Sequence, residues 1–369
     1  MKHPLATRAL LALGGLAVGL LMVEVIARIV PAAGHADLLF DSPDASPVGL
    51  YVIDPELVLV PKPGFEDTIR SRGYTVDLAF NELGLRSPPL DQLPEGPRWL
   101  AVGDSFTASV QVPLEDTFGA RLGQSLGEVV LNAGVDGYST WQASGRAARL
   151  DPTVNAHATL LTFFLGNDLQ DNANFEHVKR TVQGREAGSP IPRAPVHMGR
   201  RLLMRYSAIY GHLRIWQRAR DLQSGRDPSR EWWRDELAIF SSQGEPALRR
   251  LMRPTQQALR VARDAAGRRG DRLVVALAPP AFVVYPDRLG ATFAVVGLDP
   301  ASATPDAPAQ AVTTTLHQLG IQACDLTPAL RAAAAGDDAL YFTYDGHWTA
   351  AGHRVVAEAL ALCVALESP

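Results

Sequence analysis

The chain has 369 residues, of which 47% are hydrophobic and 20% are charged, and its formal net charge is −4 at pH 7. This length and composition allow a buried hydrophobic core and argue against a largely disordered protein. The sequence has no long basic run, so it offers no clustered positive surface for the phosphates of a nucleic acid. We therefore expect a globular protein that binds no nucleic acid.

The N-terminal segment is apolar enough to enter a membrane. Basic residues lie within residues 1–8, and the apolar run that follows reaches Pro31, interrupted only by Glu24 and Arg28, which are spaced to pair on one helix face. About 20 apolar residues cross a bilayer as a helix, and basic residues before the span favour a cytoplasmic N-terminus. Residues 1–36 are therefore expected to anchor the chain in the inner (cytoplasmic) membrane, with the rest on the periplasmic side.

A cleaved signal peptide is the alternative, and it would release a secreted protein. The small residues around Gly34-His35-Ala36 are compatible with such a cleavage site. Both interpretations export the remainder of the chain. Residues 37–97 are rich in Pro, Gly and Asp, with β-like runs at 57–60 and 74–80, and are expected to form an extended lead-in that packs on the main domain.

From residue 98 to residue 369 the pattern changes to apolar strands that alternate with helices. Strands are expected at 99–102, 128–131, 158–165, 272–278 and 321–326. Helices are expected at 118–126, 140–150, 245–268 and, with Thr349 as N-cap, 350–366. Such alternation indicates an α/β domain with a parallel sheet covered on both faces. The polar, Trp-containing stretch at about 170–245 does not follow this alternation of strands and helices, and we expect it to be a helical insertion.

Polar or glycine-rich turns follow these strands. The carboxyl ends of parallel strands meet at one edge of a sheet, which is where ligands bind in such folds. The turns at that edge contain Gly103-Asp104-Ser105, Asn132 to Tyr138, and Gly166-Asn167-Asp168, and Asp345-Gly346-His347 precedes the last helix. We expect them to converge on one site.

The residue types at this edge suit acyl transfer. A serine hydroxyl needs a base to remove its proton, and the base needs a third group to orient it, so Ser105, His347 and Asp345 are the candidate nucleophile, base and orienting carboxylate. Asp345 and His347 are two apart and would point the same way in an extended segment. The backbone N–H groups of Ser105 and Gly137 and the side-chain amide of Asn167 are the candidate oxyanion hole.

Several neighbouring residues are expected to be structural. Asp104 and Asp168 suit loops held by backbone hydrogen bonds, His353 is expected to be structural or on the surface, and Trp348 suits packing. The Trp and Arg residues of 200–235 are expected to form a packed helical face, with a lid or a platform for a sugar ring or the membrane as the alternative. No third ligand of suitable spacing accompanies the Asp-x-His pair, so we predict neither a metal nor another cofactor.

The chain has two cysteines, Cys324 and Cys363. They form no CxxC motif, and we expect two separate buried residues that behave as small apolar side chains. A disulfide between them in an oxidising compartment is the alternative.

The turns resemble, in the same order, the four sequence blocks of the SGNH (GDSL) hydrolases: Gly103-Asp104-Ser105, Gly137, Gly166-Asn167-Asp168 and Asp345-x-His347. The resemblance covers roughly residue 98 to the C-terminus, and Asn81-x-x-Gly84-Leu85-Arg86 resembles the lead-in of bacterial membrane-anchored members. It implies a flavodoxin-like three-layer α/β/α sandwich, with Ser105 as nucleophile, His347 as base, and Ser105, Gly137 and Asn167 as oxyanion hole.

The last block departs from the usual Asp-x-x-His pattern, because Tyr344 stands where that Asp would be. The observed Asp-x-His-Trp resembles the variant of bacterial polysaccharide O-acetylation proteins, which favours acyl transfer to a glycan. We expect a serine esterase or deacylase that acts on acyl esters, mainly O-acetyl, of a cell-envelope glycan or a lipid-like compound. One alternative is an O-acyltransferase that modifies a polysaccharide, and another is a non-catalytic glycan-binding or scaffold protein of the envelope. The acyl group, the alcohol and the oligomeric state stay open.

Overall fold

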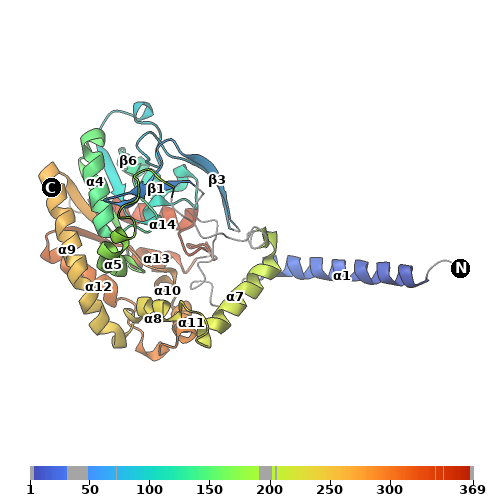
Figure 1. Cartoon of the computed structure of the whole chain (residues 1–369). Coiled ribbons are helices and arrows are strands. Elements are labelled where there is room, and N and C mark those ends of the chain that lie inside the picture. The colour runs from blue at the N-terminus through green and yellow to red at the C-terminus, as the bar shows by residue number, and fades with distance from the viewer. Residues whose placement is uncertain are drawn as a thin grey trace.

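The computed structural model describes residues 4–30, 49–71, 73–190, 202–203, 206–336, 338–343 and 345–365. A long N-terminal helix, α1 (Pro4–Ile29), projects from a body in which helices surround a central sheet (Figure 1). The stretch Leu10–Ile29 of α1 is long and apolar enough to cross a membrane, by length and composition, and none of it is buried. A signal sequence would meet the same criterion. The suggested cleavage site at 34–36 lies outside the described residues.

The central sheet has five parallel strands in the order β6-β5-β7-β8-β9. Their bounds are β5 (Arg98–Val102), β6 (Val129–Asn132), β7 (Ala158–Phe164), β8 (Arg272–Ala278) and β9 (Gln322–Asp325). This is the flavodoxin-like order, so the predicted strands and the predicted parallel α/β architecture are confirmed. After β5 the chain adds β6 on one side of it and β7 on the other, so β5 and β7 flank the topological switch point of the sheet. The crevice beyond the carboxyl ends of these two strands is the expected ligand position.

Helices cover both faces of the sheet, and each face has its own hydrophobic core. Because successive side chains of a strand point to opposite faces, Leu100 and Val102 of β5 enter one core and Trp99 enters the other. The first core packs against α4 (Thr140–Val154), α9 (Glu245–Arg269) and α12 (Ala307–Gln318). The second packs against α3 (Phe118–Leu126), α13 (Thr327–Ala333) and α14 (Ala350–Ala365). Thr349 Oγ1 accepts from Gly352 N at 3.2 Å, as the predicted N-cap of α14.

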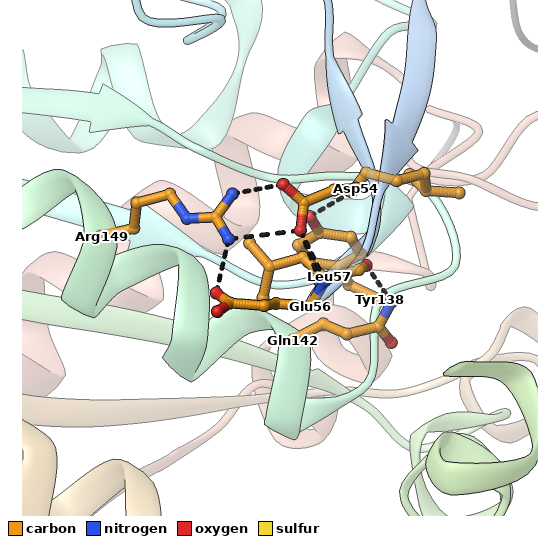
Figure 2. Close-up of polar contacts among 7 residues, drawn as sticks. Asp54, Glu56, Leu57, Tyr138, Gln142 and Arg149 are labelled. Atoms are coloured by element: carbon orange, nitrogen blue, oxygen red, sulfur yellow. Dashed lines mark hydrogen bonds and ion pairs between the residues drawn. The ribbon is translucent and has the colours of Figure 1, made fainter. Parts of the chain in front are cut away.

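The described part of the lead-in contains two antiparallel hairpins, formed by β1 (Tyr51–Asp54) with β2 (Val58–Pro61) and by β3 (Glu66–Arg70) with β4 (Thr75–Ala79). The first hairpin docks on α4 (Figure 2). Arg149 pairs with Asp54 at 2.6 Å and with Glu56 at 2.9 Å, and Gln142 Nε2 donates to Leu57 O at 2.9 Å. These contacts join the lead-in to the α/β body.

The stretch 170–245 contains most of α5 (Asp168–Arg180), turns at 181–190, and the helices α7 (Ala208–Gln223) and α8 (Arg230–Ala238). Helix α7 runs from the end of α1 toward α8 and α11 (Pro286–Val296) at one end of the body (Figure 1). Glu24 of α1 accepts from Ala208 N at 2.6 Å and from Ile209 N at 3.1 Å, so it caps the N-terminus of α7. Glu24 also forms the predicted ion pair with Arg28, at 3.1 Å.

Cys324 and Cys363 form a disulfide, with their Cα atoms 6.0 Å apart. The expectation of two separate cysteines was therefore wrong. Cys324 lies on β9 and Cys363 on α14, which packs beside that strand. The bond ties the last helix to the edge of the sheet.

Candidate active site

Ser105 begins the short helix α2 (Ser105–Ala108), directly after β5. Asp104 precedes it, and its Oδ1 accepts from Phe106 N at 2.9 Å. Gly103 adopts φ +151°, and a Cβ there would lie 2.7 Å from the carbonyl oxygen of Thr162 on β7. Only glycine fits a backbone with this φ so close to the neighbouring strand. The tight turn leaves Ser105 at the switch point between β5 and β7.

His347 contacts Ser105 and Asp345 through its two ring nitrogens. Its Nε2 lies 2.7 Å from Ser105 Oγ, and its Nδ1 is hydrogen-bonded to Asp345 Oδ1. The segment is a turn rather than the extended strand that we expected, because Gly346 N donates to Phe342 O at 2.9 Å and Gly346 adopts φ +76°. The turn brings the two side chains together. Tyr344 lies outside the described residues.

The electrostatics of the pair favour its charged form. Burial lowers the pKa of His347, but the negative charge of Asp345 outweighs it, so the pKa lies above its usual value. Burial raises the pKa of Asp345, but the charge and hydrogen bond of His347 and a hydrogen bond from Tyr74 bring it below its usual value. The Tyr74 hydroxyl donates to Asp345 Oδ2 at 2.7 Å. Sequence reasoning missed Tyr74, which lies in the lead-in, far from every motif.

The candidate oxyanion donors are only partly brought together. Ser105, Asn167 and His347 line one pocket, whereas Gly137 is not among its lining residues. Gly137 is exposed in the loop between β6 and α4, with φ +72°. Asn167 precedes α5, and its buried Oδ1 has no hydrogen-bond partner among the described residues. Because no hydrogen bond fixes the amide oxygen, the Asn167 side chain can turn its NH₂ group toward the pocket.

This pocket has a volume of about 390 Å³ and an aromatic wall that includes Phe106, Phe164, Phe240 and Phe282. The insertion contributes another part of the wall, with Arg218 from α7 and Trp232, Trp233 and Glu236 from α8. Trp216 and Trp232 are 61% and 53% exposed, so the expected packed face was wrong for both. The alternative of a lid or platform fits Trp232 because it lines the pocket.

Carboxyl groups extend from the Ser105 turn toward α8. Burial raises the pKa of Asp104 to about 7, the pKa of Asp171 to about 7 and the pKa of Glu236 to about 9. Burial, reinforced by the charge of Asp104, also raises the pKa of Asp168. As predicted, Asp104 and Asp168 hold loops: Asp168 Oδ2 accepts from Phe164 N at 3.0 Å. Sequence reasoning missed Glu236.

His353 and Trp348 are structural, as expected. Phe118 N donates to His353 Nδ1 at 3.2 Å, and burial lowers the pKa of His353 to about 3. Trp348 is fully buried and its ring packs edge-on against Phe106 at 4.8 Å. Within the described part of the chain, no group of three or more His, Cys, Asp or Glu residues is arranged to hold a metal ion.

The Asn81-x-x-Gly84-Leu85-Arg86 run supports the Ser105 helix from the outside. Asn81 Oδ1 accepts from the backbone N–H groups of Leu83 and Leu85 at 3.0 Å, which forms the turn. The turn directs the buried Arg86 guanidinium to the carbonyl oxygens of residues 108, 109 and 112, just beyond α2. Burial lowers the pKa of Arg86 to about 10. The lead-in thus holds the end of the segment that carries Ser105.

Residues 241–369 match the protein family described as "SGNH hydrolase-like domain, acetyltransferase AlgX". The matched segment contains Asp345 and His347 but not Ser105. No curated protein matches the sequence significantly.

Solved structures that match this chain include a lipolytic protein and two esterases. A lipolytic protein of the G-D-S-L family from Desulfitobacterium hafniense DCB-2 is 14% identical, with 73% of this chain and 99% of that chain covered and a TM-score of 0.37. A catalytic mutant of the acetylxylan esterase Axe2 from Geobacillus stearothermophilus is 14% identical, with 74% of this chain and 96% of that chain covered and a TM-score of 0.37. The esterase EstA from Pseudoalteromonas sp. is 10% identical, with 73% of this chain and 98% of that chain covered and a TM-score of 0.37. The match over residues 241–369 shows that this part of the chain is similar to the SGNH hydrolase-like domain of the AlgX acetyltransferase family, and the chain has the five-stranded parallel sheet of an α/β fold.

Proposed function

We propose that the protein is an exported serine esterase or deacylase of the SGNH type, with Ser105, His347 and Asp345 as its catalytic residues. One observation carries the proposal: His347 Nε2 lies 2.7 Å from Ser105 Oγ while its Nδ1 is bonded to Asp345. A nucleophile within hydrogen-bond reach of an oriented base is the arrangement that activates a serine.

The reaction proceeds in two halves. Ser105 Oγ passes its proton to His347 Nε2 and attacks the acyl carbonyl carbon. This attack forms a tetrahedral intermediate. His347 then gives this proton to the leaving alcohol as the C–O bond breaks, leaving the acyl group on Ser105. In the second half His347 takes a proton from water, whose oxygen attacks the acyl carbon. His347 then returns the proton to Ser105 Oγ as the bond between Ser105 Oγ and the acyl carbon breaks and the carboxylic acid leaves.

The negative oxygen of the intermediate needs preorganised donors. Ser105 and Asn167 line the same pocket, and the backbone N–H of Ser105 and the side-chain amide of Asn167 are proposed for this role. Gly137 is proposed as the third donor on the family resemblance and on its left-handed backbone, which allows close approach to a ligand.

A second candidate function is acyl transfer. The family that matches residues 241–369 is described as an acetyltransferase, which supports a sugar hydroxyl in place of water in the second half. The polysaccharide is then the acceptor of the acyl group, which is mainly acetyl. For the esterase, the proposed substrate is an acyl ester, mainly O-acetyl, of a cell-envelope glycan or a lipid-like compound.

Labelling with a fluorophosphonate probe tests the serine chemistry. We expect one adduct, on Ser105, that is absent in Ser105→Ala and slow in His347→Ala. An unlabelled wild-type protein would favour the non-catalytic glycan-binding or scaffold function. Transfer is tested with p-nitrophenyl acetate and an oligosaccharide acceptor: acetylated oligosaccharide forming faster than free acetate supports a transferase, and the reverse supports an esterase.

We also propose that α1 is retained as a single-pass anchor in the inner membrane, with residues 37–97 as lead-in and 98–369 as the periplasmic catalytic domain. Removal of α1 would leave the N-terminus of α7 without its Glu24 cap. The disulfide suits an oxidising compartment. The test is alkaline extraction of membranes: an anchored chain stays in the pellet with its N-terminus intact, whereas a cleaved chain is released.

A further inference from the structure

The pocket at Ser105 is larger than an acetyl group needs. Its volume of about 390 Å³ falls within the range of pockets that hold whole small molecules, roughly 300–1,000 Å³. Arg218, Trp232 and Glu236 of the insertion form the polar part of the wall away from Ser105 and His347. A substrate whose carbonyl reaches Ser105 therefore extends toward these three side chains.

Glu236 is the unusual member of this wall. It is only 5% exposed, and its carboxyl group makes no hydrogen bond or ion pair with any other residue in the described ranges. Burial, together with the nearby charge of Asp171, raises the pKa of Glu236 to about 9. At neutral pH it is therefore an uncharged group that can both donate and accept a hydrogen bond. An unsatisfied polar group on an aromatic wall is costly unless a ligand pairs with it.

The surrounding charges select the kind of ligand. Arg218 is held at the pocket by Asp227, at 3.6 Å, and its guanidinium would repel a cationic ligand. An anionic ligand would lose its hydration beside Glu236, where burial already disfavours a negative charge on a carboxyl group, and the Arg218 guanidinium that could pair with it is already paired with Asp227. An uncharged ligand avoids both costs. Trp232, 53% exposed, adds a ring face of the kind on which the C–H face of a sugar packs.

We propose that Glu236, Trp232 and Arg218 form a binding site for the uncharged, hydroxylated part of the ester, a neutral sugar residue, with the Glu236 carboxyl hydrogen-bonded to a sugar hydroxyl. This inference rests on the proposed function, because it takes the ester carbonyl to lie at Ser105. It makes Glu236 a specificity-determining residue and disfavours uronic acid residues at this position.

Binding tests the inference separately from the chemistry. Ser105→Ala protein is titrated by calorimetry with neutral xylo-, cello- and manno-oligosaccharides and with oligogalacturonate. We expect at least one neutral oligosaccharide to bind, and at least tenfold more tightly than the uronate. Adding Glu236→Ala weakens that binding about tenfold, whereas Glu236→Gln, which still donates and accepts, changes it less than about threefold. No neutral binding, equal uronate binding, or no effect of Glu236→Ala overturns the proposal.

Kinetics give a second readout with a matched control. Glu236→Ala is expected to raise the KM for an acetylated neutral oligosaccharide and to lower its kcat/KM about tenfold relative to that for p-nitrophenyl acetate. Glu231, on the same helix with a side chain 76% exposed, is the control: Glu231→Ala leaves this ratio unchanged. A ratio unmoved by Glu236→Ala contradicts the inference alone. Failure of Ser105 to react with the fluorophosphonate contradicts the proposed function, and the titration still decides whether the sugar site exists.

Discussion

The Tyr74 hydroxyl donates a hydrogen bond to Asp345 Oδ2 at 2.7 Å, across 271 residues of sequence. Because Asp345 Oδ1 is bonded to His347, both oxygens of the carboxylate are engaged. The Tyr74 ring also packs against Phe342, at 5.1 Å between centroids. The second lead-in hairpin therefore supports the turn that carries Asp345 and His347, from outside the central sheet.

Replacing Tyr74 by Phe removes this bond and keeps the ring. We expect kcat/KM for p-nitrophenyl acetate to fall roughly tenfold, as for a lost hydrogen bond to a charged group. In Tyr74→Phe the negative charge of Asp345 is no longer shared with a hydrogen bond from Tyr74, so it raises the pKa of His347 further. The acid limb of the pH–rate profile therefore moves to higher pH in Tyr74→Phe.

The pH profile separates positioning from a general loss of structure. Tyr210→Phe, on helix α7 and outside the residues that hydrogen-bond Asp345, is the matched control and is expected to keep both the rate and the profile. A Tyr74→Phe protein with an unshifted acid limb would show that Tyr74 only stabilises the fold.

The titration of His347 predicts the pH dependence of the wild-type enzyme. The base must be uncharged to accept the Ser105 proton, and the Asp345 carboxylate holds the pKa of His347 above its usual value. Activity is therefore lost as pH falls, with a midpoint above about 6.5, the ordinary histidine value. Asp345→Asn removes the charge, so the midpoint moves down while kcat falls by roughly 10²–10⁴. A midpoint unchanged in Asp345→Asn would remove Asp345 from the proposed triad.

Arg86 predicts a large stability effect outside the site. Arg86 is 1% exposed, and its guanidinium bonds three backbone carbonyl oxygens at and beyond the end of α2. Arg86→Met leaves these acceptors unpaired, at about 1–3 kcal/mol each, and we expect a total loss on the order of 4 kcal/mol. Urea denaturation in detergent measures it, with the exposed Arg250→Met as a control expected to stay within about 0.5 kcal/mol. A loss as small as that of the control would contradict the role of Arg86.

The sheet and the core of the site were predictable because their signals are local. The strands that become β5, β7 and β8 are apolar on both faces, which marks a covered parallel sheet. Ser105 and Asn167 follow two of these strands directly, so topology alone places them at one edge. The turn at Gly346 was not predictable from residue spacing, since a glycine with φ +76° brings Asp345 and His347 together in place of an extended segment.

The missed features depend on contacts between distant segments. Tyr74 and Glu236 each lie in a stretch that no motif covers, and only the folded chain brings them to Asp345 and to the Ser105 pocket. Helix α11 had a usable signal, Pro286 at its first turn and Gly297 at its end, but its apolar composition also suits a strand. The disulfide likewise needed the knowledge that α14 packs beside β9.

The disulfide predicts a dependence of stability on the redox state. Cys324 and Cys363 close a loop with a sequence separation of 39 residues. Cys363→Ser, or reduction, is expected to lower the free energy of unfolding by about 2–4 kcal/mol. Mass spectrometry after alkylation without reductant should find neither cysteine modified in native membranes. Alkylation of both would show that the cysteines are separate in the cell.

Glu236 makes a prediction about stability that is independent of any substrate. Burial raises the pKa of Glu236 from 4.5 to about 9, so between these values the folded chain keeps a proton that the unfolded chain has released. The contribution of Glu236 to stability is therefore present below about pH 4.5 and is lost as pH rises toward 9. Glu236→Gln removes this loss, so at pH 8 the variant should be more stable than the wild type, on the order of 2 kcal/mol, and no more stable at pH 4. The exposed Glu231→Gln should match the wild type at both pH values, and a wild-type protein as stable as Glu236→Gln at pH 8 would mean that the Glu236 carboxyl is solvated or paired.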